Sequence, residues 1–142
     1  MDVEVKRERE HVMSLDGNSI MIGHSLGPAF ILNVLQLNDV KIKAAFFVAP
    51  FVGDLGIEEF DSVNKSFTKD KFDYAKIKSK CGRFYVYCSD NDPYVPMSKS
   101  SYLSEKLDAK FTVIKNGEHL NAGSGYFKFP LLLDDIKKEL GL

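Results

Sequence analysis

The sequence predicts an α/β fold with three layers, in which a parallel β-sheet lies between two layers of helices. Short apolar runs alternate with stretches of helical pattern, which is typical of βαβ units and of parallel sheets. The run 42–49 is almost uniformly apolar, as in a strand that is covered on both faces. A chain of 142 residues fits one domain, which would bury roughly two thirds of its unfolded surface. We therefore expect a single domain over residues 1–142.

The first half of the chain is expected to supply two strands and one long helix. Residues 19–22 form a short apolar strand, residues 29–37 a largely buried helix and residues 42–49 the next strand. The region 50–80 is less regular, and we expect one short helix in it, near residues 74–77. Ahead of the first strand, the charged segment 3–15 is expected to be a helix that leads into it.

The second half continues the alternation. Residues 83–88 form a third strand, because β-branched and aromatic side chains follow one another there. Residues 98–107 form a helix with serines available at its N-terminus. Residues 111–114 form the fourth strand, and residues 129–140 a terminal amphipathic helix.

Composition excludes several classes of function. The net charge of −1 gives no electrostatic reason to expect nucleic acid or anionic lipid as a partner. No apolar run is long enough to span a membrane, and the charged N-terminus lacks the apolar core of a signal peptide. Cys81 and Cys88 have no CxxC spacing, so we expect reduced, buried thiols rather than a disulfide or a metal site. These features favour a cytoplasmic protein that needs no cofactor and no metal.

Three loops follow strands of the expected parallel sheet, and ligands bind at the carboxyl ends of such strands. These loops span residues 23–27, 89–96 and 115–122. The first carries Ser25, the second Asp90 and Asp92, and the third His119. The order Ser, Asp, His along the chain is that of the α/β-hydrolase triad. The chemistry fits, because a serine hydroxyl needs an imidazole base and the imidazole needs a carboxylate to orient it.

Ser25 stands between Gly23 and Gly27, where a strand ends and a helix begins. This pattern is either an ordinary turn or a nucleophile elbow, and a lone match is weak support for the elbow. In an elbow, side chains at the two glycine positions would collide with their neighbours. A helix start would also aim the Leu26 N–H, as one half of an oxyanion hole, at a developing negative charge.

The other residues of the three loops have ordinary explanations when each is taken alone. His119 would then be a solvated surface histidine, and Asp92 before Pro93 a common turn opener. The presence of three required residues, in order and each after a strand, favours the catalytic interpretation. His24 faces away from the Ser25 hydroxyl and is expected to be packed or hydrogen-bonded behind the turn. Aromatic residues near the loops could shape an acyl pocket: Phe51, Phe72, Tyr74 and Tyr94.

Four segments resemble the small serine hydrolases of the retinoblastoma-binding protein 9 and YdeN family. They read IMIGHSLG, FFVAPFVGDLG, DYAKIKSKCGRFYVYCSDNDPYVP and KNGEHLN, and the similarity runs from about Ser19 to the C-terminus. The resemblance implies a compact α/β-hydrolase fold without a large cap. In the family's S-x-D/N-D-P-x-x-P loop the acid before the first proline belongs to the triad, which implies Asp92 and leaves Asp90 to cap the loop. Pro28 departs from the family pattern of a small residue, but the first turn of a helix tolerates proline.

The resemblance and the motifs together predict a serine hydrolase that cleaves an ester, thioester or amide through an acyl-enzyme. Ser25 attacks, His119 moves the proton and Asp92 orients His119. The substrate is expected to be a small molecule or an acyl compound. The alternative is a catalytically silent member of the fold that serves as a protein-binding module.

The family implies a strand, a helix and often a second strand ahead of the elbow strand, whereas 18 residues precede Ser19 here. We therefore expect an N-terminally short domain that lacks the first strand or strands. The loop after the first strand supplies the second oxyanion N–H, so we expect weak or no hydrolysis from these 142 residues alone. An unpaired sheet edge beside the elbow strand should also favour self-association. Restoring an upstream segment is expected to give activity and a monomer.

Overall fold

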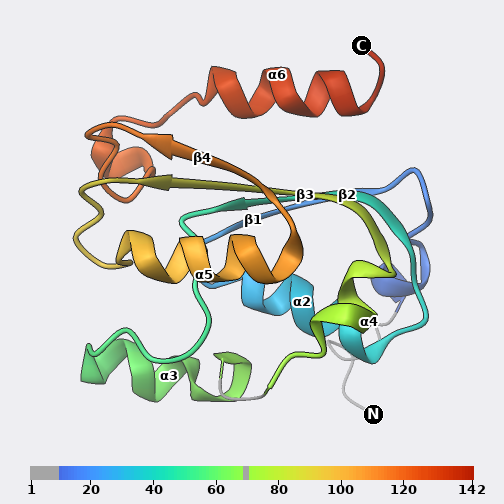
Figure 1. Ribbon diagram of the computed structural model, residues 1–142, viewed down its shortest axis with the longest axis horizontal. Coiled ribbons are helices and arrows are strands. Elements are labelled where there is room, and N and C mark those ends of the chain that lie inside the picture. The colour runs from blue at the N-terminus through green and yellow to red at the C-terminus, as the bar shows by residue number, and fades with distance from the viewer. Residues whose placement is uncertain (1–9, 69–70) are drawn as a thin grey trace.

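The computed structural model describes residues 10–68 and 71–142. Its four-stranded sheet has the order β1-β2-β3-β4, and each neighbouring pair is parallel. The strands are β1 (Ile20–His24), β2 (Ile42–Val48), β3 (Cys81–Ser89) and β4 (Lys110–Ile114). All four predicted strands are confirmed. Because the strands run in one direction, the loops that follow them meet at the same edge of the sheet (Figure 1).

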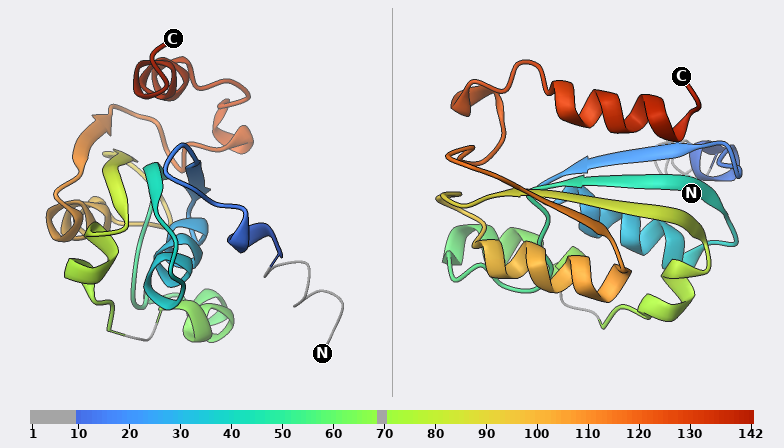
Figure 2. Two further views of the ribbon diagram at one scale, coloured as in Figure 1. Left: turned by 90° about the vertical axis from the view of Figure 1, so that its right-hand side faces the viewer. Right: turned by 45° about the horizontal axis from the view of Figure 1, so that its top comes forward.

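Helices cover both faces of this sheet, as expected (Figures 1 and 2). On one side lie α2 (Gly27–Leu37), α4 (Tyr74–Lys78) and α5 (Met97–Leu107), and on the other lies α6 (Pro130–Glu139). A short 3-10 helix, η1 (Ala122–Ser124), precedes α6. In the described part of the chain, no helix has both the length and the apolar character needed to cross a membrane.

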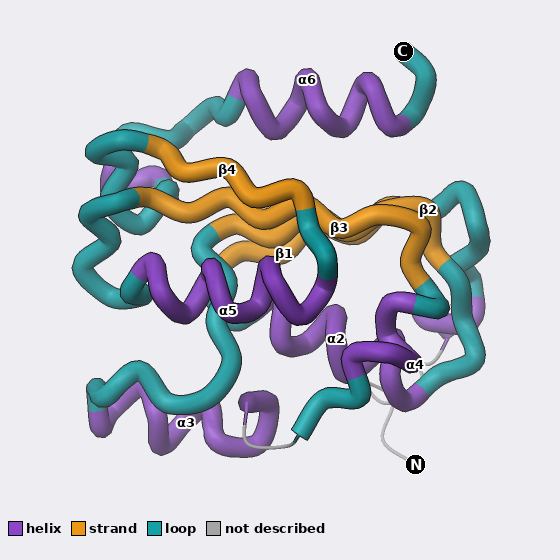
Figure 3. Tube along the Cα trace, in the orientation of Figure 1, coloured by secondary structure: helices purple, strands orange, loops and turns teal. Residues whose placement is uncertain are grey.

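Besides the short η1, one α-helix of the described chain was not predicted. The chain forms α3 (Glu58–Thr68) within the region that was expected to be irregular, and α3 lies beyond α2 on the same side of the sheet (Figure 3). Its first turn contains three acidic residues, which stabilise the positive end of a helix. One of them, Asp61, also accepts hydrogen bonds from the backbone N–H groups of Leu55 and Gly56, at 2.7 and 2.9 Å. This acidic first turn is the signal that could have revealed α3.

The sheet buries side chains on both faces, which explains the nearly uniform apolar run in β2. Ala45 and Phe47 pack against α2, α4 and α5, whereas Ala44 and Phe46 pack toward α6. All four are fully buried. The expectation of a strand covered on both faces is therefore confirmed.

The α6 layer is attached through polar contacts as well as apolar ones. The Tyr87 hydroxyl donates to the Asp135 carboxylate at 2.7 Å, and Lys110 pairs with Asp135 at 3.2 Å. Burial alone would raise the pKa of Asp135, but the hydrogen bonds from Tyr87 and Lys110 and the charges of Lys110 and Lys138 lower this pKa below its usual value. The ionised carboxylate therefore holds α6 against the sheet near neutral pH.

Strand β1 forms one edge of the described sheet. The Ser19 carbonyl and the Ser25 N–H group form hydrogen bonds with the β2 segment. Because backbone groups alternate in direction along a strand, those of Ile20 and Ile22 point away from β2. The Ile22 side chain is 54% exposed. Of the helix expected over 3–15, residues 10–13 are helical and residues 3–9 lie outside the described residues.

Candidate active site

Ser25 occupies the short turn between the end of β1 and the start of α2. Its φ is 59°, a left-handed conformation that is strained for a residue with a side chain. The Ser25 N–H donates to the Val48 carbonyl at 2.8 Å, which ties the turn to the end of β2. The backbone therefore holds Ser25 at the carboxyl edge of the sheet.

The two glycines that flank the Ser25 turn have different roles. A Cβ atom added to Gly23 would lie 2.7 Å from the backbone nitrogen of Pro28, so no other residue fits without a backbone shift. A Cβ atom added to Gly27 would meet nothing within 4 Å. The expectation that a side chain would collide is correct for Gly23 and wrong for Gly27, because the added atom at Gly27 points into open space. Pro28 lies in the first turn of α2, where proline is tolerated.

Leu26 is the residue immediately before α2. The first N–H groups of a helix have no partner within it, and the helix dipole makes this end partly positive. Leu26 and Ser25 line the same cavity. A negative charge that develops beside Ser25 would therefore face the positive end of α2.

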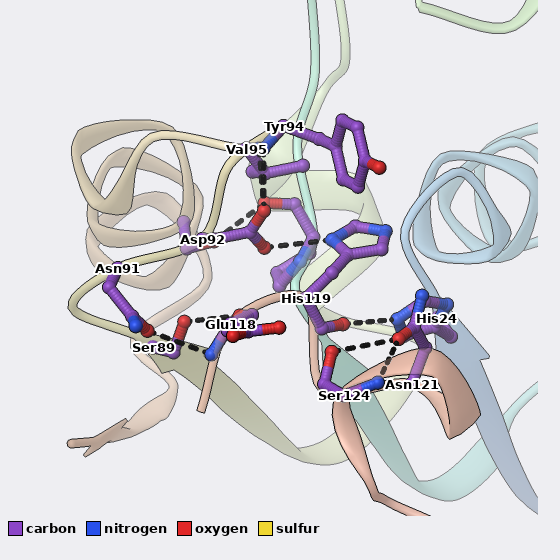
Figure 4. A network of polar contacts seen from close by, with 12 residues as sticks. His24, Ser89, Asn91, Asp92, Tyr94, Val95, Glu118, His119, Asn121 and Ser124 are labelled. Atoms are coloured by element: carbon purple, nitrogen blue, oxygen red, sulfur yellow. Dashed lines mark hydrogen bonds and ion pairs between the residues drawn. The ribbon is translucent and has the colours of Figure 1, made fainter. Parts of the chain in front are cut away.

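Asp92 and His119 form a close pair, although 26 residues separate them in the sequence. His119 Nδ1 lies 2.8 Å from Asp92 Oδ2 (Figure 4). The other carboxylate oxygen accepts the backbone N–H groups of Tyr94 and Val95 at 2.8 and 2.9 Å. The Asp92 side chain is 2% exposed. The carboxylate accepts a hydrogen bond from Nδ1–H, which leaves Nε2 of His119 for another partner.

The loops after β3 and β4 are joined by further hydrogen bonds. Asp90 accepts the Asn116 N–H at 2.7 Å, and the Asn91 side-chain oxygen accepts the Glu118 N–H at 2.8 Å. The Ser89 hydroxyl donates to the Glu118 carbonyl (Figure 4). Asp90 therefore caps the loop that carries the histidine, as expected. These contacts hold the loop from the side of β3.

Ser25 and His119 line one cavity of about 320 Å³. Its other lining residues are Leu26, Phe51, Leu55, Phe60, Asn64 and Tyr94. The three predicted loops thus meet, because Ser25 and His119 share the cavity while Asp92 binds His119 Nδ1. The prediction from sequence missed Phe60 and Asn64, because it did not include α3, and it also missed Leu55 in the loop that precedes α3.

A larger cavity of about 520 Å³ lies elsewhere and contains Phe72 and Tyr74. Of the four aromatic residues considered for an acyl pocket, Phe51 and Tyr94 therefore line the Ser25 cavity, and the other two do not. Burial and the nearby Tyr102 raise the pKa of Tyr74 to about 12, so its phenol stays neutral near pH 7. We take the smaller cavity as the candidate site because it brings a hydroxyl and an imidazole together.

His24 contacts the histidine of the site. Its Nε2 lies 2.8 Å from the His119 carbonyl oxygen, and the two rings meet edge to face with their centroids 4.7 Å apart. Of the two expected possibilities, packed or hydrogen-bonded, the hydrogen bond is confirmed, and the His24 side chain is exposed. The Tyr94 ring also lies edge to face with His119, at 5.1 Å. Tyr94 follows Asp92 by two residues, and this proximity in sequence is the signal that pointed to it.

Other reactive groups offer little competing chemistry. Cys81 and Cys88 are buried and unpaired, and burial raises the pKa of Cys81 to about 12 and that of Cys88 to about 11. Both thiols are therefore neutral and weakly nucleophilic near pH 7. Among the described residues, no three His, Cys, Asp or Glu side chains are grouped as a metal site would require.

Comparison with known proteins places this chain in a family. The serine hydrolase family matches residues 4–138. YdeN of Bacillus subtilis is 27% identical over 124 residues, which cover 85% of this chain and 63% of YdeN. The serine hydrolase RBBP9 of Rattus norvegicus is 28% identical over 101 residues, which cover 71% of this chain and 52% of RBBP9. The chain thus spans less than two thirds of the length of these two relatives.

Solved structures share the fold. The crystal structure of the ydeN gene product from B. subtilis has a TM-score of 0.87 at 24% identity and covers 97% of this chain, which spans 74% of that one. An α/β-hydrolase from a Medee basin deep-sea metagenome library has a TM-score of 0.61 at 18% identity, with 98% and 62% covered. The expected compact α/β-hydrolase fold is confirmed. Because the family match extends over nearly all of its length, this chain belongs to the serine hydrolase family.

Proposed function

We propose that this chain is a serine hydrolase that cleaves an ester, thioester or amide through an acyl-enzyme on Ser25. One observation carries the proposal. Ser25 and His119 line a single cavity, and His119 Nδ1 is bonded to the buried carboxylate of Asp92. This arrangement supplies a nucleophile, a base and the group that orients the base.

In the first step, His119 Nε2 accepts the Ser25 proton while Oγ attacks the carbonyl carbon of the substrate. The Nδ1–H bond to Asp92 selects the tautomer that leaves Nε2 unprotonated, and it stabilises the imidazolium that forms. The carbonyl oxygen becomes an oxyanion, which the Leu26 N–H at the start of α2 stabilises as one donor. The strained turn at Ser25 acts as the nucleophile elbow.

In the second half of the reaction, the tetrahedral intermediate collapses and the bond to the leaving group breaks. His119 gives its proton to the leaving group, and the acyl group remains on Ser25 Oγ. Water then attacks the acyl-enzyme while His119 again accepts a proton. The acyl–Oγ bond then breaks as His119 gives its proton to Oγ, which releases the carboxylic acid and restores the Ser25 hydroxyl and neutral His119.

A fluorophosphonate probe tests this proposal, because it reacts covalently only with an activated serine. We expect stoichiometric labelling of Ser25, located by mass spectrometry of peptides. Ser25→Ala should abolish labelling and any turnover, with an unchanged circular dichroism spectrum. Ser98→Ala, at an exposed serine in the first turn of α5, is the matched control and should label like the wild type.

The alternative is a catalytically silent protein-binding module built on the same fold. It predicts a folded chain that the probe does not label at Ser25. Labelling that persists in Ser25→Ala would instead show that another residue is the nucleophile.

A further inference from the structure

The cavity beside Ser25 has a lining that indicates which acyl groups it accepts. Phe51, Leu55 and Phe60 contribute apolar surface, and Asn64 is the polar side chain that α3 adds. Among the described residues that line the cavity, none is Asp, Glu, Lys or Arg. A buried charged group on a substrate would therefore find no counter-ion there, and burying an unpaired charge is costly.

Two of the aromatic rings that line this cavity are partly exposed to solvent. Phe60 and Tyr94 are 43% and 44% exposed, and their rings meet edge to face with centroids 6.0 Å apart. Phe51, in contrast, is 1% exposed and forms the buried part of the wall. Half-exposed rings beside a reactive centre gain favourable contact when an apolar group covers them.

We propose that the site accepts an uncharged, apolar acyl group and that α3 forms the wall against which this group packs. The proposal rests on the proposed acyl-enzyme on Ser25. The cavity volume of about 320 Å³ is near the lower limit of ~300–1,000 Å³ for ligand pockets. It holds on the order of ten non-hydrogen atoms at about 30 Å³ each, the volume of a water molecule in the liquid. An acyl chain of four to six carbons has fewer non-hydrogen atoms than this limit and therefore fits.

A series of p-nitrophenyl esters tests this specificity. The acyl groups are acetyl, butanoyl and hexanoyl, with the succinyl half-ester as the charged counterpart of butanoyl. We expect kcat/KM to rise by about fourfold for each buried methylene, and succinyl to react at least ~100-fold more slowly than butanoyl. Equal rates along the neutral series, or a faster reaction of succinyl, would overturn the proposal.

Two variants on α3 test its role as the wall. Phe60→Ala should lower kcat/KM for the hexanoyl ester about tenfold and leave the acetyl ester within about twofold. Val63→Ala is the matched control, because Val63 is on the same helix, is 72% exposed and does not line the cavity. Equal effects of Phe60→Ala on both esters would contradict the assignment. Fluorophosphonate labelling separates the two proposals. If the wild type is not labelled, the acyl-enzyme on Ser25 is refuted. If it is labelled but hydrolyses all the esters at equal rates, only the proposed preference for apolar acyl groups is refuted.

A second inference concerns His24 and rests on a different observation. A carbonyl oxygen can only accept, so His24 Nε2 must carry a proton and donate it to the His119 carbonyl at 2.8 Å. The backbone on both sides of His119 is left-handed, with φ of 51° at Glu118 and 53° at Leu120. Such a conformation persists only where surrounding contacts hold it.

The contacts that hold the His119 loop come from two directions. Ser89 and Asn91 bind Glu118 from the side of β3, whereas His24 reaches the loop from the end of β1. His24 directly precedes Ser25 in the chain. It therefore connects the backbone beside the nucleophile to the backbone of the proposed base, although β1 and β4 lie at opposite ends of the strand order.

We further infer that His24 is a positioning residue that sets the separation between Ser25 and His119. This inference also rests on the proposed acyl-enzyme. It predicts that loss of the donated hydrogen bond slows proton transfer from Ser25 and leaves substrate binding nearly unchanged. His24 is itself exposed, so its substitution should affect the rate more than the stability.

The test compares His24→Gln, which keeps an N–H donor, with His24→Phe, which keeps the ring and removes the donor. We expect His24→Phe to lower kcat and the rate constant of fluorophosphonate labelling about tenfold, with KM within about twofold. His24→Gln should restore most of both rates, at a similar melting temperature. Equal rates in the two variants, or a loss that appears only in KM, would overturn the positioning role. No labelling of the wild type would instead refute the acyl-enzyme.

Discussion

The Ser25 turn and the Asp92–His119 pair reach the same cavity but are held in different ways. Backbone packing holds the turn, through the Ser25 N–H bond to Val48 and the close approach of Gly23 to Pro28. Side-chain hydrogen bonds hold the pair, through carboxylates and amides of the loop after β3. The turn should therefore be sensitive to added atoms, whereas the pair should be sensitive to the loss of a polar atom.

Among the variants that test how the two regions are held in place, the largest expected effect is at the Asp92–His119 pair. Asp92→Asn should lower turnover by about 10⁴, because an amide no longer selects the Nδ1–H tautomer of His119. The rate of fluorophosphonate labelling measures this effect together with ester hydrolysis. An undiminished rate would show that Asp92 is not the group that orients His119.

The next largest effect tests the backbone packing that holds the Ser25 turn. Gly23→Ala should lower the rate about 100-fold, because the new Cβ atom forces the Ser25 turn to shift. Overpacking should also reduce the free energy of unfolding by about 1–3 kcal/mol, measured by urea denaturation. Gly27→Ala is the matched control, since its Cβ atom meets nothing within 4 Å. If the two variants behave alike, the turn is not held by the packing of Gly23 on Pro28.

A smaller effect is expected at the neighbouring acid. Asp90→Asn keeps an oxygen that accepts the Asn116 N–H, so the rate should fall less than about tenfold. Melting temperature and labelling rate measured on the same samples would separate loop stability from catalysis. A loss as large as that of Asp92→Asn would reverse the roles of the two aspartates.

The smallest expected effect on turnover concerns self-association, which we propose occurs through β1, an edge strand of the described sheet. Its outward-directed backbone groups and the exposed Ile22 side chain favour pairing with a second copy of the chain. Light scattering should give a mass above that of one chain, and Ile22→Lys should return it to that of one chain. Val113→Lys, on the opposite edge strand β4, is the control. A wild type that is monomeric at every concentration, or that only Val113→Lys dissociates, would contradict the proposed edge.

Patterns that are local in sequence were sufficient to predict much of this molecule. The strands, and the loops that hold Ser25, Asp92 and His119, follow from apolar periodicity and from the loop positions. The choice of Asp92 over Asp90 as the triad acid, and the role of Asp90 as a loop cap, came from the resemblance to the family. The predicted collision at Gly27 was wrong, because it depended on the space around the residue. The helix α3 was missed, because its acidic first turn lies in a stretch with an irregular apolar pattern.

The sequence by itself determined the order of the strands, of the helices other than α3 and η1, and of the polar residues after the strands, because periodicity and turn chemistry act over a few neighbouring residues. Only the tertiary structure decided which distant side chains meet. Phe60 and Asn64 line the Ser25 cavity, whereas Phe72 lines another cavity. His24 forms a hydrogen bond with the His119 carbonyl. These contacts join segments far apart in the chain, and their formation depends on how whole helices and strands pack rather than on any short pattern.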